Sequence, residues 1–259
     1  MKRVYTFLLI CGAFLKGARA SVPEETLQWF AHSIKLIEFQ PCKHLANFGT
    51  TYGGHTLCTT MLKKQKDKKD CLYINYGIEQ DYSFDSEFSN HSGCMGVALD
   101  PTVTHPSELV PNVMFLKLAA PSLERNVSTK DWQIMSLPRL WHWLGERHVF
   151  AVKYDCEGCE YALMTSEKDE DMDRFFEHVH QLNIEFHLHK SFLDSQEKLQ
   201  TFANLLNMLR RHNFHLIHVA VAGCGRDVKQ EKSCMDAVYD AGVPCEGHDC
   251  SSFLFMKTL

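Results

Sequence analysis

The sequence predicts an α/β fold, a doubly wound sandwich in which helices cover both faces of a mostly parallel sheet. From residue 71 onward, short apolar runs alternate with segments of helical periodicity, which is typical of successive βαβ units. Seven of these runs have the length of a strand. No repeat, proline-rich linker or low-complexity tract divides the chain, so we expect one domain over residues 71–259, preceded by an extension over residues 21–70.

The expected elements follow one another in a regular order. Residues 24–40 form an amphipathic helix, and residues 41–70 form a loop-rich segment that contains cysteines. Strands are expected at 72–77, 95–99, 112–118, 148–154, 182–188, 214–220 and 252–257. Helices are expected at 82–90, 137–147, 171–179 and 196–211. A cysteine-rich insertion at about 223–250 precedes the last strand.

The first twenty residues predict a cleavable signal peptide. Two basic residues precede an apolar run over residues 4–15, and residues 18–20 supply the small residues of an A-x-A cleavage site. The run is shorter than the roughly 20 residues that a membrane-spanning helix needs, and an uncleaved anchor is the alternative interpretation. We expect a mature chain that begins near Ser21, is secreted or enters the secretory lumen, and has no membrane anchor after cleavage.

The cysteine count fits an oxidising compartment. The chain has 11 cysteines, one of which lies in the signal segment, so an even ten remain and disulfide bonds are their expected state. The sequence does not determine how they pair. Asn90 and Asn126 each begin an N-x-S/T sequon and are candidate glycosylation sites. The last four cysteines lack the close spacing of zinc knuckles, so we expect disulfides there too.

The charge balance argues against nucleic acid as a partner. Removal of residues 1–20 takes away four basic and no acidic side chains, which leaves 23 basic against 32 acidic ones. Binding of phosphates needs a basic surface, and we expect the single basic run, residues 63–69, to be a solvated loop. The pattern predicts no particular oligomeric state.

Candidate binding residues follow the first two strands. In a doubly wound sheet, ligands bind beyond the carboxyl ends of the strands, where the strand order reverses. The first strand ends in Gly77, which permits a sharp turn close to a ligand, and Glu79 follows it. Asp100 ends the second strand 23 residues later, near the spacing at which a carboxylate binds the hydroxyl pair of a nucleotide ribose. The alternative for Asp100 is a turn-forming role before Pro101.

An acidic segment follows the fourth strand. Asp155, Glu157 and Glu160 are close enough to repel one another unless they face solvent, a cation or a positively charged ligand. The alternative is the start of a helix, where acidic residues are favoured. Cys156 and Cys159 form a C-x-x-C pair, as in thiol oxidoreductases. Because the pair interrupts an acidic motif, a structural disulfide is the better interpretation.

The fifth strand carries three alternating polar residues. Glu185, His187 and His189 share one face of it. Such a set can hold a divalent metal, with Asp155 of the adjacent strand as a further ligand. The alternatives are a role for His187 as a general base or polar core residue, and chance clustering in a chain with 15 histidines.

Four segments in this order resemble one protein family. They are residues 72–84 (LYINYGIEQDYSF), 93–102 (GCMGVALDPT), 152–161 (VKYDCEGCEY) and 184–187 (IEFH). They are similar to the FkbM-related methyltransferase-like proteins, most closely to the group of methyltransferase-like protein 24 and its secreted animal relatives. The resemblance covers about residues 40–259, and the cysteines at 42, 58 and 71 also match those of the group.

The resemblance implies a class I methyltransferase fold, with a seven-stranded sheet whose last strand is antiparallel, and S-adenosyl-L-methionine as the cofactor. Carried over by position, the cofactor-binding residues are Gly77, Glu79, Asp100, Asp155 and Glu157. Asp155 or His187 is then the candidate base that takes a proton from the methyl acceptor. The acceptor can be a glycan, a small molecule or a protein.

Two departures from the family keep a second function open. Glu79 stands where the family has the second glycine of its loop, and Cys156 and Cys159 flank the acidic turn. A carboxylate at position 79 can pair with the amino group of the cofactor or obstruct its pocket. We therefore expect a methyltransferase of the secretory pathway; the alternative is a catalytically inactive, secreted binding protein of the same fold. A C-x-x-C thiol oxidoreductase is the third hypothesis.

Overall fold

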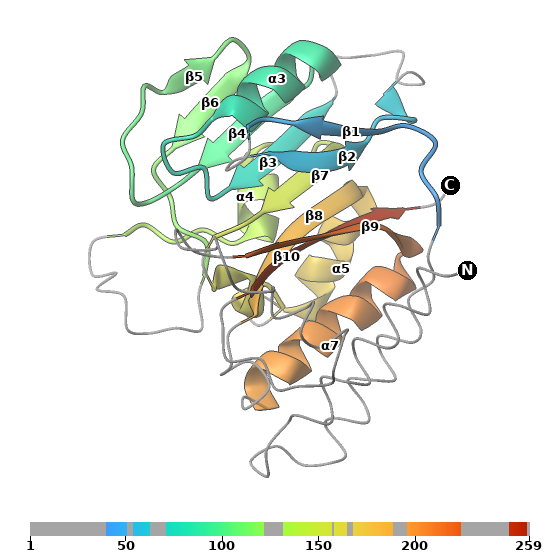
Figure 1. The fold of residues 1–259 in the computed structure, drawn as a ribbon. Coiled ribbons are helices and arrows are strands. Elements are labelled where there is room, and N and C mark those ends of the chain that lie inside the picture. The colour runs from blue at the N-terminus through green and yellow to red at the C-terminus, as the bar shows by residue number, and fades with distance from the viewer. Residues whose placement is uncertain are drawn as a thin grey trace.

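The computed structural model describes residues 40–50, 54–62, 71–121, 132–156, 158–164, 168–188, 196–223 and 249–257. Within them, an eight-stranded sheet runs through the centre of the molecule (Figure 1). The signal segment, the sequon at Asn126, the basic run 63–69 and residues 224–248 of the insertion lie outside the described residues. So does the helix expected at 24–40, apart from its final residue.

The central sheet has the topology that the resemblance implies. Its strands are β3 (Leu72–Tyr76), β4 (Met95–Leu99), β5 (Glu108–Val110), β6 (Val113–Leu116), β7 (Val149–Tyr154), β8 (Val179–Leu188), β9 (Phe214–Gly223) and β10 (Asp249–Lys257). They lie in the order β5-β6-β4-β3-β7-β8-β10-β9. The strands from β6 to β8 are parallel neighbours, whereas β10 runs antiparallel to both β8 and β9. Without β5, this is a seven-stranded sheet with a reversed last strand, so the predicted class I methyltransferase fold is confirmed.

Strands β8, β9 and β10 are each three residues longer than predicted, and two further details of the prediction for this domain are wrong. Strand β5 pairs antiparallel with β6 and adds an eighth strand that no periodicity predicts, because its three side chains are exposed or half-buried. The helix expected at 137–147 ends at Trp143 instead. The chain then turns through Gly145 at φ 85° and Glu146 at φ 54°, which no helix continues through.

The segment 41–70 also differs from its prediction as a loop-rich stretch. It contains a second, two-stranded sheet made of β1 (Leu45–Phe48) and β2 (His55–Cys58), which pair antiparallel. A disulfide bond between Cys42 and Cys58 ties the end of β2 to the residues before β1. Strands of only four residues are too short to show a clear alternation of apolar and polar side chains.

Helices and the small sheet cover opposite faces of the central sheet. Helices α4 (Leu137–Trp143), α5 (Asp169–His178) and α7 (Gln196–Arg211) lie on one face. Helix α3 (Ser83–Ser92) lies on the other face together with β1 and β2 (Figure 1). Every residue of β3 and β7 is buried, as expected for parallel strands that are covered on both sides.

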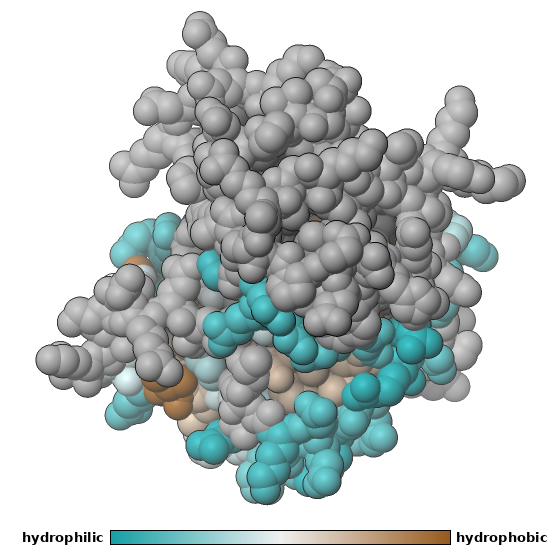
Figure 2. Space-filling model, turned by 90° about the horizontal axis from the view of Figure 1, so that it is seen from below, coloured by the Kyte–Doolittle hydropathy of each residue, from teal (hydrophilic) through white to brown (hydrophobic). Residues whose placement is uncertain are grey.

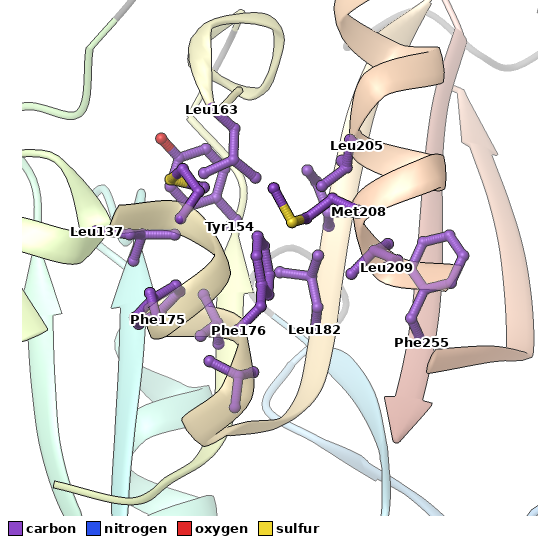
Figure 3. Close-up of a cluster of buried hydrophobic side chains, with 14 of the residues drawn as sticks. Leu137, Tyr154, Leu163, Phe175, Phe176, Leu182, Leu205, Met208, Leu209 and Phe255 are labelled. Carbon is purple, nitrogen blue, oxygen red and sulfur yellow. The ribbon is translucent and has the colours of Figure 1, made fainter. Parts of the chain in front are cut away.

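The larger core lies between the sheet and helices α4, α5 and α7. Phe175 and Phe176 of α5, Leu182 of β8 and Leu209 of α7 meet there with no exposed surface (Figure 3). The sequence determines this contact, because α5 and α7 place apolar residues at helical spacing along one side and charged residues along the other. This packed face leaves the polar site to form on the opposite side and at the strand ends.

The face of the molecule drawn in Figure 2 shows no large apolar area among the described residues visible there. Seen from below in Figure 2, they are mostly hydrophilic, with apolar colour confined to small areas. No helix among the described residues is both long enough and apolar enough to cross a membrane. A disulfide between Cys71 and Cys94 joins the starts of the neighbouring strands β3 and β4, in line with the prediction that cysteines are oxidised.

A buried carboxylate lies between α3 and the sheet. The side chain of Asp85 has no exposed surface; its Oδ2 accepts a 2.7 Å hydrogen bond from Nδ2 of Asn75, and its Oδ1 has no partner among the described residues. Burial raises the pKa of Asp85 to about 6 from an ordinary value of 3.8. The folded protein therefore holds this proton more tightly than the unfolded chain does.

We expect Asp85→Asn to remove a pH dependence of stability. Between about pH 4 and pH 6 the folded state binds more protons at this site than the unfolded state, so the free energy of unfolding falls as pH rises, by about 3 kcal/mol in total. Denaturant unfolding from pH 4 to pH 7 measures the slope, which should be flatter in the variant than in the wild type. The control, Asp169→Asn on the exposed start of α5, should keep the wild-type slope. Equal slopes in all three proteins would contradict the prediction.

Candidate functional site

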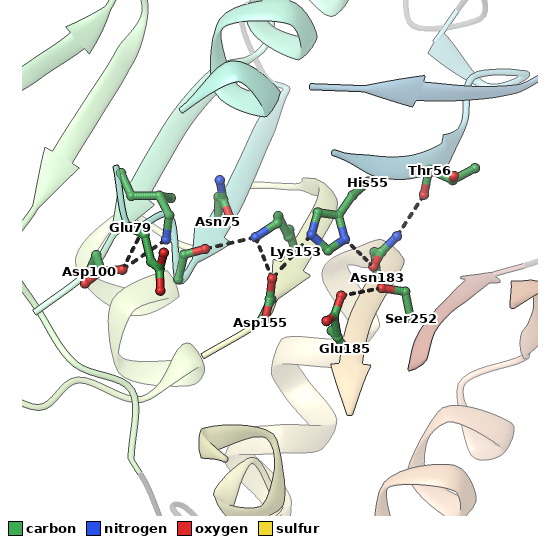
Figure 4. A network of polar contacts seen from close by, with 12 residues as sticks. His55, Thr56, Asn75, Glu79, Asp100, Lys153, Asp155, Asn183, Glu185 and Ser252 are labelled. Atoms are coloured by element: carbon green, nitrogen blue, oxygen red, sulfur yellow. Dashed lines mark hydrogen bonds and ion pairs between the residues drawn. The ribbon is translucent and has the colours of Figure 1, made fainter. Parts of the chain in front are cut away.

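Charged and polar side chains gather where the strands of the central sheet end. Gly77, Asp100 and Asp155 follow β3, β4 and β7 directly, and Glu185 lies on β8. Figure 4 shows Lys153, Asp155, His55 and Asn183 in one series of polar contacts, with the contact of Asp100 to Glu79 and the contact of Glu185 to Ser252 as separate pairs beside it. The chain therefore brings together residues from the first, second, fourth and fifth of the predicted strands, and adds one from β2.

The glycine turn after β3 is required by the neighbouring strand. Gly77 has φ 79°, and its N–H donates to the carbonyl of Leu99 at 2.9 Å. A Cβ atom at this position would overlap the carbonyl oxygen of Asp155. Glycine is therefore needed at this position so that the ends of β3 and β7 can pack closely. This is a second reason for glycine, besides close approach to a ligand.

Asp100 organises the loop that follows Gly77. Its Oδ2 accepts from the backbone N–H groups of Ile78 and Glu79, at 3.1 and 2.9 Å. Its Oδ1 accepts from the N–H and the hydroxyl of Thr102. These four donors match the four acceptor positions of a carboxylate, and the Asp100 residue is only 4% exposed. The bond to Thr102 two residues later is the turn-forming role that the sequence left as the alternative for Asp100.

Lys153 is a buried cation that the sequence analysis did not single out. It is 3% exposed on β7; its Nζ donates to the carbonyl of Gly77 at 2.9 Å and lies 3.4 Å from Oδ2 of Asp155. A buried ammonium is costly unless it is paired and hydrogen-bonded. Lys153 therefore joins the ends of β3 and β7 at the point where the strand order reverses.

His55 reaches the same carboxylate from β2. Its side chain is 2% exposed, and its Nε2 lies 3.4 Å from Oδ2 of Asp155. Its Nδ1 lies 3.1 Å from Oδ1 of Asn183 on β8. Burial lowers the pKa of His55, and the nearby Lys153 ammonium lowers it further, against the opposing effect of Asp155.

Two amide side chains hold β2 on the face of β8. Gln181 accepts from the N–H of Cys58 at 2.8 Å and donates to its carbonyl at 3.0 Å. Asn183 donates to the carbonyl of Thr56 at 2.9 Å. Both amides are buried and replace the hydrogen bonds that a neighbouring strand would make. The result is a fixed position for His55 over the sheet.

Only part of the metal-ligand set predicted on β8 lies among the described residues. Glu185 is described, whereas the side chain of His187 and all of His189 lie outside the described residues. Instead, Glu185 lies together with His55 and Asp155, and one ligand atom of each lies within 4.8 Å of the others. The hydroxyl of Ser252 on β10 donates to Oε2 of Glu185 at 2.9 Å.

The acidic segment after β7 separates into different environments. Asp155 keeps 21% of its side chain exposed. Glu160 is 1% exposed, and its Oε2 accepts from the N–H of Gly158 at the start of the 3-10 helix η3 (Cys159–Ala162). Glu160 therefore stabilises its own turn, which agrees with the alternative interpretation of the acidic segment as the start of a helix. Glu157 lies outside the described residues, and Cys156 is disulfide-bonded to Cys159, as the structural interpretation of the pair expects.

Comparison with known proteins does not assign a family to the chain. No family model and no curated protein matches it. Similar solved structures include phosphoethanolamine N-methyltransferase 2 of Haemonchus contortus in complex with phosphomonomethylethanolamine and S-adenosylhomocysteine, at 10% identity and a TM-score of 0.35 over 77% of this chain and 52% of that one. The present chain thus spans about half the length of the Haemonchus contortus chain.

Two further structures are similar over most of their length. A variant of the 16S rRNA (adenine(1408)-N(1))-methyltransferase of Catenulisporales acidiphilia shares 9% identity at a TM-score of 0.36, over 83% of this chain and 99% of that one. A SAM-dependent methyltransferase of Archaeoglobus fulgidus shares 8% identity at a TM-score of 0.33, over 76% and 91%. Similarity at this level assigns neither a substrate nor a family to this chain.

We expect Gly77→Ala to destabilise the protein far more than a matched glycine substitution. Gly145 also has a positive φ, 85°, but a Cβ atom there would meet nothing within 4 Å. Gly145→Ala should cost about 1 to 2 kcal/mol for the left-handed backbone alone. Gly77→Ala adds the overlap with Asp155 and should cost about 3 kcal/mol or more in the free energy of unfolding. Denaturant titration of both variants measures the difference, and similar losses would refute the close contact.

Proposed function

We propose that this protein is an S-adenosyl-L-methionine-dependent methyltransferase of the FkbM-related type that acts in the secretory pathway or outside the cell. The observation that carries the proposal is the position of the polar site in the sheet. From β3 the chain proceeds to β4 and β6 on one side and then to β7 on the other. Gly77, Asp100 and Asp155 therefore surround the reversal of strand order, where open α/β sheets bind ligands.

The residues at this point fit the cofactor in part. Glu79 is exposed after the glycine turn, and Asp155 is partly exposed after β7. Both carboxylates would hold its cationic groups, and the cofactor would supply a methyl group on a sulfonium. Asp100 shapes the loop through its four donors. A ribose hydroxyl could bind Asp100 only if it displaced one of these four donors. The contact of Asp100 with a ribose therefore stays a prediction.

The chain's own part in the reaction would be to position the acceptor and accept its proton. Asp155 is the candidate for the base among the described residues, with Lys153 balancing its charge at 3.4 Å. His187 remains the second candidate from the sequence. The acceptor is a glycan, a small molecule or a protein side chain in this proposal, with nucleic acid disfavoured by the net negative charge.

The secretory location is supported by the oxidised cysteines. The bonds Cys42–Cys58 and Cys71–Cys94 join positions far apart in the sequence, as in proteins of oxidising compartments. Asn90 is exposed on α3 and accessible to a glycan. The signal peptide and its cleavage near Ser21 complete the proposal.

The same observations favour a catalytically inactive, secreted binding protein as the second candidate. All four acceptor positions of Asp100 are in use, and the backbone of Asp155 lies directly against Gly77. If the protein's own groups occupy the ligand-binding position, the fold is retained but the methyl-transfer activity is lost. The thiol oxidoreductase hypothesis places its reactive thiol at Cys156, which is half-buried and disulfide-bonded to Cys159, and it stays the third candidate.

Calorimetric titration of the oxidised, glycosylated full chain tests the proposal. S-adenosylmethionine and S-adenosylhomocysteine should bind with affinities in the micromolar range. Asp100→Asn should weaken binding at least about tenfold, because the loss of one charge-assisted acceptor from the loop costs about 1.5 to 3 kcal/mol. The control Asp169→Asn should bind as the wild type does, and circular dichroism verifies that each variant is folded.

Two results would decide between the candidates. Absence of binding of both compounds to the folded wild type would refute cofactor use. Binding without formation of S-adenosylhomocysteine from any member of a glycan, peptide and small-molecule panel would favour the inactive binding protein.

A further inference from the structure

We infer that His55, Asp155 and Glu185 form a binding site for one divalent transition-metal ion. The three residues come from β2, the end of β7 and β8, and one ligand atom of each lies within 4.8 Å of the other two. One imidazole nitrogen and two carboxylate oxygens form a mixed donor set that suits Zn²⁺ or Mn²⁺. The inference goes beyond the proposed methyl transfer and does not depend on it.

Hydrogen bonds fix the tautomer of His55. Nδ2 of Asn183 donates to the carbonyl of Thr56, so Oδ1 of the same amide faces the imidazole ring. An amide oxygen only accepts, and Nδ1 of His55 must therefore carry the hydrogen. In the neutral ring the lone pair is then on Nε2, the nitrogen that faces Asp155. Hydrogen bonding of the second nitrogen of a metal-binding histidine to a side-chain oxygen is the usual arrangement around such sites.

The two facing atoms have the spacing of ligands to one ion. Nε2 of His55 lies 3.4 Å from Oδ2 of Asp155. Two donor atoms at about 2.1 Å from a tetrahedrally coordinated metal lie about 3.4 Å apart. Without a cation, two electron pairs face each other across this distance inside the protein. A second proton on His55 would instead place an imidazolium beside the buried Lys153 ammonium.

Carboxylates outnumber the ammonium group in this cluster. Asp155 and Glu185 are two carboxylates, and Lys153 is the ammonium that contacts the first of them, at 3.4 Å. The hydroxyl of Ser252 orients Glu185 by its bond to Oε2. Asp155 keeps 21% of its side chain exposed, so an ion can enter from solvent. With a metal bound, Asp155 would hold the ion and His187 would be the remaining candidate base.

Titration of the full, oxidised chain with ZnCl₂ and, separately, with MnCl₂ tests the inference without any methyl donor. One ion per chain should bind, and Asp155→Asn and Glu185→Gln should each weaken its affinity at least about tenfold. Both changes keep the shape of the side chain. The control is Asp173→Asn, since Asp173 forms another histidine–carboxylate contact, 2.7 Å from Nε2 of His212, and should not affect binding.

A second variant keeps the test decisive if either substitution impairs folding. Ser252→Ala removes only the hydroxyl that orients Glu185 and should weaken metal binding several-fold with little change in thermal stability. The inference is overturned if the folded wild type binds neither ion at millimolar concentration. It is equally overturned if binding persists with unchanged affinity in folded Asp155→Asn or Glu185→Gln, since the ion would then lie at other residues.

Discussion

The position of β2 on the face of β8 is the constraint on which the site depends. Strands normally join a sheet at its edge, where backbone groups are available. Here Gln181 and Asn183 supply amide groups that pair with the backbone of β2 from above the sheet. This contact buries β2 and places His55 near the carboxyl end of β7. Nε2 of His55 then lies 3.4 Å from Oδ2 of Asp155.

The buried Lys153 connects this contact to the rest of the sheet. Its ammonium binds the carbonyl of Gly77 and lies beside Asp155, and it also lowers the pKa of His55 by its charge. Burial of a charge requires compensating partners, and both of its partners lie at strand ends. The geometry of the candidate site and the stability of the strand ends are therefore maintained by the same atoms.

The fold could be predicted from the sequence because periodicity reports burial. Apolar strands and one-sided helices such as α7 leave a regular pattern, and the bounds predicted for 95–99 and 196–211 coincide with the structure. The residues at strand ends, Gly77, Asp100 and Asp155, could be named for the same reason. His55 could not, because a short strand that docks on a face through side chains has no signature in its own sequence. Lys153 had a signal, a charge inside a strand that is otherwise apolar, which requires a buried partner.

The two proposed roles of the site converge on one oxygen atom. Oδ2 of Asp155 lies 3.4 Å from the ammonium of Lys153 and 3.4 Å from Nε2 of His55. A metal ion would be held by the imidazole and the carboxylate, and Lys153 offsets part of the charge of the same carboxylate. The effects of substitutions at these three residues should therefore be non-additive, since each changes what the other two experience. A cationic ligand near β7 would likewise share Asp155 with the Lys153 side chain. Glu185 is the second carboxylate of the cluster, and one of its oxygens lies within 4.8 Å of the ligand atoms of Asp155 and His55, so a bound metal ion would connect β8 to the strand β2 that carries His55.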